Sequence, residues 1–257
     1  MSYQEILTRL EDGVLTITIN RPHTYNALST NTKLELADAF RQADDNMEVR
    51  AIVLTGAGDK AFCSGQDLSE SQTVNEETAK IWIDEFDHLY RTIRSVYKPI
   101  IASINGFATG SGLQLALLCD IRISNETAKY GMTEVNVGLA CIIGSTMFEE
   151  VMGKSRMTDL ILTGRLLDAT EAKEYSLVTR LVPNDRLAYE TKKLALELAS
   201  KPPVAVRSNK QWIRMLSDEN FDRCMAHSVI AHQVGYASGE PQRAMEEFFE
   251  QRKLKKG

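Results

Sequence analysis

Apolar and polar residues alternate near the start of the chain. The segment VLTITI at residues 14–19 has the period-two pattern of a half-buried strand. The Asp12-Gly13 pair before it is typical of a tight hairpin turn, which predicts a partner strand over residues 6–10. The chain is therefore expected to open with a β-hairpin.

A helical pattern follows the loop at residues 21–28. Ser29 or Thr30 is suited to cap a helix, because a side-chain oxygen there can accept from the first free N–H groups. Apolar residues recur at spacings of three and are expected on the buried face: Leu34, Ala37, Phe40 and Ala43. An apolar strand over residues 51–55 comes next, so the chain begins strand, strand, helix, strand.

Strands and helices continue to alternate beyond this point, which indicates the α/β class. The pattern predicts in turn a helix over 77–96, a strand over 99–104, a Gly-rich turn over 105–112, a short apolar helix over 113–118 and a strand over 120–124. From about Thr146 helices dominate, with one short strand near residues 177–182. The strand–strand–helix order is also compatible with a structural repeat that the residues no longer display.

The segment Lys201-Pro202-Pro203 is the predicted boundary of a C-terminal appendage, because everything after it has a helical pattern. The chain then divides into a core over 1–200 and a helical region over 201–257. The sequence has 257 residues, 43% hydrophobic and 25% charged, which is the composition of an ordinary globular protein. That length is sufficient for a full core without disulfides or a structural metal.

Charge and hydropathy exclude two classes of partner. Thirty Lys and Arg against thirty-five Asp and Glu give a net charge of −5, which repels nucleic acid and anionic membranes. The longest apolar stretch, residues 113–118, is far short of the ~20 residues of a membrane span, and the N-terminus lacks a basic segment followed by an apolar one. We expect a cytoplasmic protein with neither a nucleic-acid nor a membrane partner.

Several familiar motifs fail on their spacing. The four cysteines and four histidines are scattered, so no metal site and no disulfide framework is predicted. Gly153-Lys154-Ser155 resembles the end of a phosphate-binding loop, but position 148 is Phe where the motif needs Gly. The glycines Gly106, Gly110 and Gly112 do not have the G-x-G-x-x-G spacing of a dinucleotide site.

Two turns of small residues remain, at residues 62–68 and 105–112, each after a predicted strand. Such turns present free backbone N–H groups, and the second turn opens a helix whose N-terminal dipole favours negative charge. Together they are suited to form an oxyanion hole. The alternative from the residues alone is that two glycine turns merely let the chain bend tightly.

Several separate motifs, in one order along essentially the whole chain, resemble the crotonase (enoyl-CoA hydratase/isomerase) superfamily. They are Asn20-Arg21-Pro22 with Asn26-Ala27-Leu28, the stretch 61–68 (AFCSGQDL), the stretch 98–112 (KPIIASINGFATGSG), Cys119-Asp120, the stretch 131–138 (GMTEVNVG), Leu162-Thr163-Gly164 and the tail 248–253 (FFEQRK).

This resemblance implies a spiral of ββα turns with a C-terminal helical trimerisation region, assembled as a homotrimer or a dimer of trimers. It also implies acyl-CoA thioester substrates, with no metal or other cofactor. The backbone N–H groups of Gln66 and Ser111 match the donors that hold the thioester oxygen, and Ser111 stands where the family often has Gly. The matched substrate-binding positions are Ala27, Ser64, Gln66, Asp67, Leu68, Gly110, Ser111 and Gly112.

One position departs from the hydratases of this family, which place two Glu carboxylates beside the acyl chain. This sequence has Gln114 at the first of these positions and Glu134 at the second. An amide has no usable protonation equilibrium near neutrality, so Gln114 can orient a water or substrate but cannot be a general base or acid. Glu134 alone suffices to move a proton from C2 to C4 of a 3-enoyl-CoA. The resemblance and this departure together favour an enoyl-CoA isomerase.

The alternatives are a hydratase that uses Glu134 with water held by Gln114, another crotonase reaction such as decarboxylation or thioester hydrolysis, and a non-catalytic acyl-CoA-binding protein. Asp67 and Asp84 are the nearby acidic candidates for the other reactions. The apolar residues 139–143 suit either an acyl-chain wall or the core, and Cys141 among them is read as packing.

Two further segments are assigned from the resemblance. Residues 70–76 often form a mobile flap in relatives. The basic residues Arg252, Lys253, Lys255 and Lys256 suit either a CoA phosphate contact or a solvated tail.

Overall fold

The computed structural model describes residues 3–254 of the chain, and the side chains of residues 3–251. Its main sheet has six strands in the order β1-β2-β3-β5-β7-β9. These are β1 Ile6–Glu11, β2 Val14–Ile19, β3 Ala51–Gly56, β5 Ile100–Ile104, β7 Ile121–Asn125 and β9 Arg180–Val182. The predicted hairpin of β1 and β2 is confirmed as the one antiparallel pair of this sheet, and all other neighbours in it are parallel.

A second, smaller sheet was not predicted. It consists of β4 Ala61–Cys63, β6 Phe107–Thr109 and β8 Tyr130–Gly131, which pair in parallel. Strand β4 overlaps the start of the predicted turn at 62–68, and β6 lies inside the predicted turn at 105–112. With two or three residues each, these strands are too short to display a period-two pattern.

The two sheets together produce a spiral of ββα turns. Strand β3 of the main sheet leads to β4 of the small sheet and then to helix α3 (Ala79–Ser95), and β5 leads in the same way to β6 and α4 (Ser111–Leu118). The structural repeat is therefore real although the residues do not repeat. Because each turn adds one parallel strand to each sheet, the loops that follow β4 and β6 leave the small sheet at the same edge.

Helix α1 (Thr30–Asp45) shows which of two predicted caps is used. The Oγ of Ser29 accepts from the N–H of Thr32 at 3.0 Å, so Ser29 is the N-cap. The prediction that Leu34 is buried is wrong, since 54% of it is exposed and Leu36 takes its place in the core. A strict spacing of three drifts by about 60° per step around a helix of 3.6 residues per turn, so Leu34 leaves the face that holds Phe40.

Helices cover both faces of the main sheet. On one face α1, α3 and α4 pack into the larger core, where α3 contributes an apolar stripe at helical spacing: Trp82, Ile83, Phe86, Leu89, Tyr90 and Ile93. On the other face α8 (Leu187–Ala199) packs Leu194 against Ile101 and Ile123. Strand β5 is buried throughout, as expected for a parallel strand covered on both sides.

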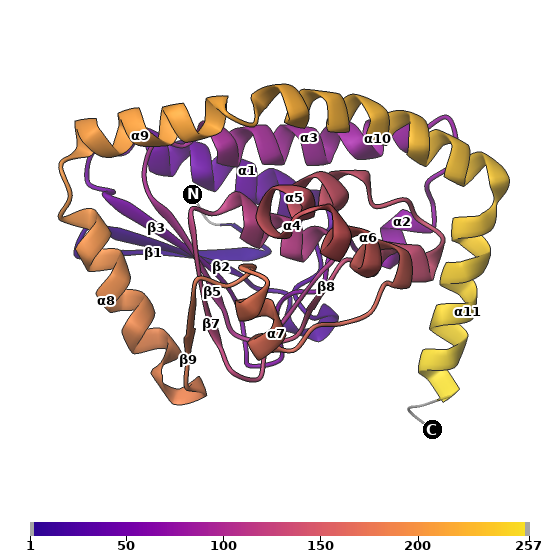
Figure 1. Ribbon diagram of the computed structural model, residues 1–257, viewed down its shortest axis with the longest axis horizontal. Helices are drawn as coiled ribbons and strands as arrows, with labels where there is room; N and C mark the ends of the chain where they lie inside the picture. Colours follow the sequence, from indigo (N-terminus) through magenta and orange to yellow (C-terminus); the bar gives the residue numbers. More distant parts are fainter. Residues whose placement is uncertain (1–2, 255–257) are drawn as a thin grey trace.

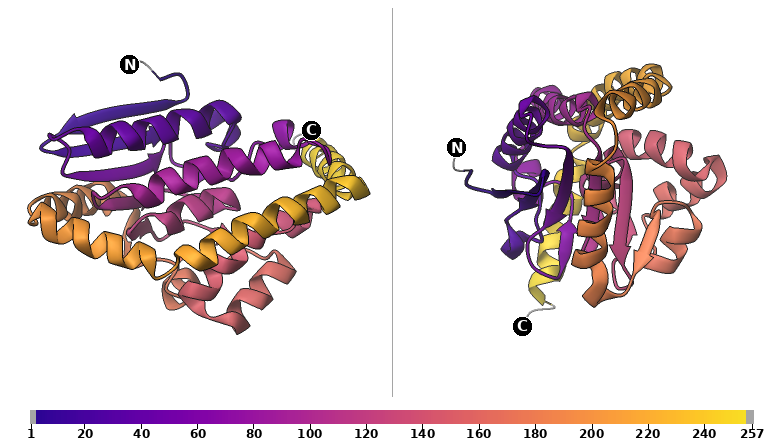
Figure 2. Two further views of the ribbon diagram at one scale, coloured as in Figure 1. Left: turned by 90° about the horizontal axis from the view of Figure 1, so that it is seen from above. Right: turned by 90° about the vertical axis from the view of Figure 1, so that its left-hand side faces the viewer.

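The chain after Pro202 is helical, as predicted: α9 Pro203–Met215, α10 Asp218–Ser238 and α11 Glu240–Leu254. Helices α9 and α10 run along one side of the molecule, and α10 packs on α3 and on α5 (Ile142–Met152) (Figure 1). Helix α11 turns away from the end of α10 and packs on the short helix η2 (Glu134–Val137), a bend that two further views also show (Figure 2). No helix in the described part of the chain has the length and apolar character to cross a membrane.

The remaining helices are short and connect these layers. They are η1 Pro22–Thr24, α2 Leu68–Ser71, α6 Lys154–Thr163, α7 Ala169–Glu174 and η3 Asn184–Arg186. The segment predicted as a flap, residues 70–76, holds the end of α2 and the loop after it. Two contacts tie it to the C-terminal helices: Ser71 Oγ lies 2.7 Å from Tyr236 Oη, and Gln242 Nε2 donates to the Val74 carbonyl at 3.1 Å.

Candidate active site

The two small-residue turns meet at the edge of the small sheet. Gly65 has a φ of +104°, a conformation that side chains with a Cβ rarely adopt. A Cβ atom there would lie 3.0 Å from the Thr109 carbonyl oxygen and 3.5 Å from the Ser111 nitrogen. A Cβ on Gly112 would overlap the Cys63 carbonyl. Both glycines are therefore required for the turns to touch.

Two backbone N–H groups in these turns lack a protein acceptor. The Gly65 carbonyl accepts from Leu28 N–H at 2.8 Å, and Asp67 N–H donates to the Leu28 carbonyl at 3.0 Å. These bonds hold the turn on either side of Gln66, whose own N–H donates to nothing in the described chain. The same is true of the Ser111 N–H at the start of α4. Both N–H groups are therefore available to donate to a bound acceptor.

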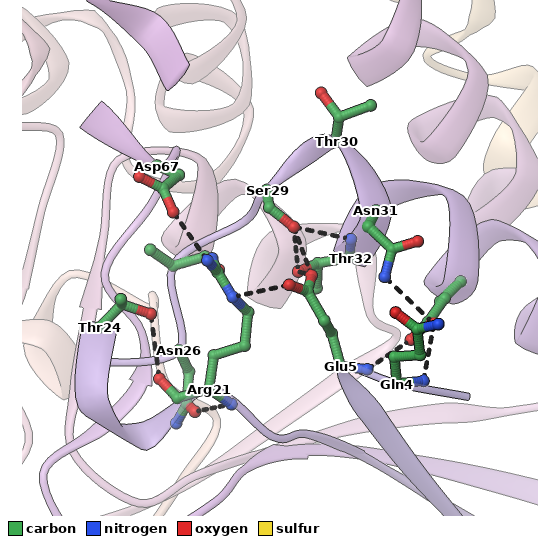
Figure 3. A network of polar contacts seen from close by, with 12 residues as sticks. Gln4, Glu5, Arg21, Thr24, Asn26, Ser29, Thr30, Asn31, Thr32 and Asp67 are labelled. Carbon is green, nitrogen blue, oxygen red and sulfur yellow. Dashed lines mark hydrogen bonds and ion pairs between the residues drawn. The ribbon is translucent and has the colours of Figure 1, made fainter. Parts of the chain in front are cut away.

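A largely buried arginine anchors the first turn. Arg21 pairs through Nε with Glu5 Oε1 at 3.1 Å, and its Nη atoms donate to Asp67 Oδ2 at 2.9 Å and to the Ala27 carbonyl at 2.6 Å (Figure 3). Burial alone would raise the pKa of Asp67, but hydrogen bonds from Ser69 and Arg21 outweigh it and hold that pKa below its usual value. Asp67 is thus an ionised anchor of the loop rather than a free acid.

Glu134 reaches the same place from η2. Its Oε1 and Oε2 lie 3.5 and 3.9 Å from the position that a Cβ on Gly110 would take, so the carboxyl stands directly beside the second turn. Oε1 accepts from Gln114 Nε2 at 3.0 Å, and Oε2 is buried with no partner in the described residues. Gln114 in turn accepts at its Oε1 from Tyr90 Oη at 2.9 Å.

The surroundings change the acidity of Glu134. Burial raises its pKa above the ordinary value of 4.5, and the neighbouring donors oppose this shift: the Glu134 backbone N–H, the Cys141 thiol and the Gln114 amide. Burial raises the pKa of the Cys141 thiol well above normal, and the charge of Glu134 adds to this effect. The thiol therefore stays protonated near neutrality, in agreement with its interpretation as packing.

A cavity of about 1130 Å³ joins these groups. It is lined by most of the predicted binding residues: Ala27, Ser64, Gln66, Asp67, Leu68, Gly110, Ser111, Gln114 and Glu134. Ile83, Phe86, Val137, Cys141, Ile142 and Ile143 form an apolar wall, so part of the segment at 139–143 lies at the cavity as well as in the core. This volume is slightly above the roughly 300–1,000 Å³ of typical sites for drug-sized molecules.

Two predicted residues do not reach the cavity. Gly112 was expected to contact substrate, but it lies behind the wall against Cys63, where its lack of a side chain serves packing. Asp84 was a candidate acid, but it lies on the exposed face of α3, paired with Lys80 at 2.5 Å. The side chains of Arg252, Lys253, Lys255 and Lys256 lie outside the described residues.

Several cavity residues were not predicted from the sequence. His232 on α10 and Glu246 and Phe249 on α11 line the cavity because α10 packs on α3 and α5 and α11 packs on η2. Tyr90 belongs to the apolar stripe of α3, a pattern that indicates core rather than chemistry. No local signal distinguishes any of these residues. Within the described chain, no group of His, Cys, Asp and Glu is arranged to hold a metal ion.

The chain is similar to known proteins over nearly its whole length. Residues 9–256 match the family model described as Enoyl-CoA hydratase/isomerase. The chain belongs to the enoyl-CoA hydratase/isomerase family. It is 33% identical over 254 residues to the crotonyl-CoA hydratase of Syntrophomonas wolfei, with 98% of both chains covered.

Other members of the enoyl-CoA hydratase/isomerase family are similar over comparable lengths. A probable enoyl-CoA hydratase of Rhizobium meliloti is 36% identical over 238 residues, which is 90% of this chain and 91% of that one. The crystal structure of an enoyl-CoA hydratase/isomerase from Pseudoalteromonas atlantica superposes with a TM-score of 0.87 at 30% identity, covering 96% of this chain and 98% of that one. The protein is thus an enzyme of the crotonase superfamily with the ββα spiral that the motifs implied.

Proposed function

We propose that this enzyme shifts the double bond of a 3-enoyl-CoA to the 2-position. The observation that carries the proposal is the pairing at the second turn, where one buried carboxylate, Glu134, stands beside an amide, Gln114, and two backbone N–H groups lack acceptors. An amide can neither take nor give a proton near neutrality, so Glu134 must perform both transfers.

The reaction requires an acceptor for negative charge at the thioester oxygen. The N–H groups of Gln66 and Ser111 supply it, with the N-terminal dipole of α4 behind Ser111. Glu134 removes a proton from C2, and the electron pair of the broken C–H bond spreads over a dienolate whose oxygen the two N–H groups hold. The same carboxyl then protonates C4, which restores the thioester carbonyl and leaves the double bond between C2 and C3.

The raised pKa of Glu134 supports this use. A carboxylate that burial makes more basic removes the C2 proton more readily, and its conjugate acid persists long enough to protonate C4. All the bond changes use groups of the substrate and this one carboxyl. No cofactor is required beyond the coenzyme A that the substrate carries.

A hydratase is the second candidate, favoured by the names of the relatives, among them the crotonyl-CoA hydratase of Syntrophomonas wolfei. In that reaction Gln114 would hold a water that Glu134 activates. Decarboxylation and thioester hydrolysis have no comparable support, since Asp67 is held by Arg21 and Asp84 lies away from the cavity.

Incubation with 3-hexenoyl-CoA, followed by chromatography and mass spectrometry of the acyl-CoA products, tests the proposal. Isomerisation keeps the mass, whereas hydration adds one water. We expect 2-hexenoyl-CoA as the main product. A predominant water-added product, or rapid hydration of crotonyl-CoA, would assign the enzyme as a hydratase instead.

The exposed apolar surface of the C-terminal helices supports assembly into a homotrimer or a dimer of trimers. Trp212 is 61% exposed, and Leu216 and Val234 are each 67% exposed. Apolar patches of this kind mark interfaces between proteins. We expect Trp212→Glu with Leu216→Glu to reduce the mass measured by light scattering to that of one chain. Met47→Glu, at a loop residue that is 90% exposed, should leave the mass unchanged.

A further inference from the structure

A buried chain of hydrogen bonds leads from α3 to the carboxyl of Glu134. Tyr90 Oη donates to Gln114 Oε1 at 2.9 Å, and Gln114 Nε2 donates to Glu134 Oε1 at 3.0 Å. Tyr90 is 0% exposed and Gln114 is 5% exposed, so water does not compete for these groups.

When Glu134 is ionised, each donor and acceptor in this series of hydrogen bonds is fixed. A carboxylate can only accept, so Gln114 must turn its NH₂ toward Glu134 and its carbonyl oxygen toward Tyr90. The phenol must then donate its proton to that oxygen. The reversed amide would place its carbonyl oxygen against the carboxylate, which is a repulsive pair of acceptors.

This series of hydrogen bonds uses only one oxygen of the Glu134 carboxyl. Oε2 of Glu134 is buried and has no hydrogen-bond partner in the described chain, although it lies near Gly110 in the second turn. Because Oε1 already accepts from Gln114, Oε2 is the oxygen left to take a proton.

We propose that Tyr90 is a positioning residue for proton transfer: it locks the amide of Gln114 so that Glu134 Oε1 stays an acceptor and Oε2 takes up and releases the substrate proton. This inference deepens the proposed function and rests on it for the identity of the proton donor. It concerns a tyrosine that does not line the cavity.

The consequence is a defined effect on acidity. The Gln114 N–H stabilises the ionised form of Glu134 and so lowers its pKa. Without the Tyr90 hydroxyl, the amide is free to rotate and to present its carbonyl oxygen, which accepts from the protonated carboxyl. The pKa of Glu134 then rises further, and the basic form is present only at higher pH.

Few other groups act on Glu134. The titratable side chains nearest to it are Tyr90 from α3 and the Cys141 thiol before α5, both with a pKa raised by burial. From α11, which packs on η2, Glu246 and Glu250 share the cavity. Tyr90→Phe leaves the Cys141 thiol, Glu246 and Glu250 in place, and the Tyr90 hydroxyl that it removes contacts Gln114. A shift in Tyr90→Phe therefore reports on the amide.

The test is a titration of the Glu134 carboxyl by infrared difference spectroscopy, with the band identified by subtracting the spectrum of Glu134→Gln. Tyr90→Phe keeps the ring and its packing, and we expect its midpoint about one pH unit above that of the wild type. The matched control is Tyr130→Phe, since Tyr130 is also 0% exposed but bonds to Ser124. An unshifted midpoint in Tyr90→Phe, or an equal shift in the control, overturns the inference.

Two further readouts separate the possible failures. In a Gln114→Leu background, Tyr90→Phe is expected to cause no additional shift of the Glu134 midpoint, because the amide that transmits the effect is gone. An undiminished shift in that background also overturns the inference. The acidic limb of kcat/KM for 3-hexenoyl-CoA is expected to move with the titration. A wild type without isomerase activity would refute the proposed function. The titration needs no turnover, so the spectra would still test the role of Tyr90.

Discussion

Gln114 Nε2 lies 3.0 Å from Glu134 Oε1. The position that carries a second carboxylate in hydratases of the family therefore carries a hydrogen-bond donor to the remaining carboxylate. That donor stabilises the charged form of Glu134, whereas a second carboxylate at the same distance would oppose it. Gln in place of Glu at position 114 therefore leaves one acid–base group instead of two, and it also changes the basicity of Glu134.

Replacing Glu134 by Gln removes the acid–base group while keeping its volume. We expect the turnover of 3-hexenoyl-CoA to fall by about 10²–10⁴-fold, the usual contribution of general acid–base catalysis. Binding of a saturated acyl-CoA, measured by calorimetry, should change little, because the N–H groups of Gln66 and Ser111 remain. Full activity in Glu134→Gln would rule out the assigned role of this carboxyl.

Replacing Gln114 by Glu creates a pair of carboxyls about as close as the present hydrogen bond. Like charges at this separation cannot both ionise, so one proton is shared and one pKa rises strongly. We expect hydration of crotonyl-CoA to increase at least about tenfold, because a second acid–base group becomes available. The matched control Gln114→Met has similar volume and no ionisable group. An equal gain in both variants would contradict the reasoning.

The raised pKa of Glu134 also affects stability. A carboxyl whose pKa is higher in the folded state than the unfolded value of 4.5 binds its proton more tightly when folded. Below pH 4.5 the carboxyl is protonated in both states, so its burial costs no stability. As the pH rises from 4.5 through the folded pKa, the unfolded state loses its proton first and the folded state loses stability. Glu134→Gln stays neutral throughout. We therefore expect its melting temperature to exceed that of the wild type at pH 8 by a few degrees. The difference should vanish near pH 4, and a difference independent of pH would point to packing instead.

Arg21 joins Glu5 on β1 to Asp67 in the first turn, and its side chain is 13% exposed. Replacement by Met leaves two partly buried carboxylates without their cation, so we expect a loss of about 3 kcal/mol in the free energy of unfolding in urea. Because Asp67 follows Gln66, the turn should loosen and kcat should fall. The control is Arg9→Met, since Arg9 pairs with Glu11 while 77% exposed and should change stability by less than about 0.5 kcal/mol. Equal effects in the two variants would refute the anchoring role.

Local patterns along the chain were enough to predict the elements whose stabilising contacts repeat at the period of a helix or strand. The hairpin of β1 and β2, the helix cap at Ser29 or Thr30 and the helices beyond Pro202 all depend on residues a few positions apart, and the structure shows that the cap is Ser29. The motifs also predicted the family, and they placed Gln66, Ser111, Gln114 and Glu134 together although 68 residues separate the first from the last.

The folded chain alone decided what those residues contact. Strands β4 and β6 have three residues each, and only their pairing within the small sheet, with one another and of β6 with β8, makes them strands. Tyr90 has the spacing of a core residue on α3, and nothing in its neighbours in sequence indicates that α3 packs its hydroxyl against Gln114 on α4. His232 and Glu246 reach the cavity because α10 packs on α3 and α5 and α11 packs on η2. Periodicity records which side of an element is buried, whereas the partner on that side depends on how distant elements pack.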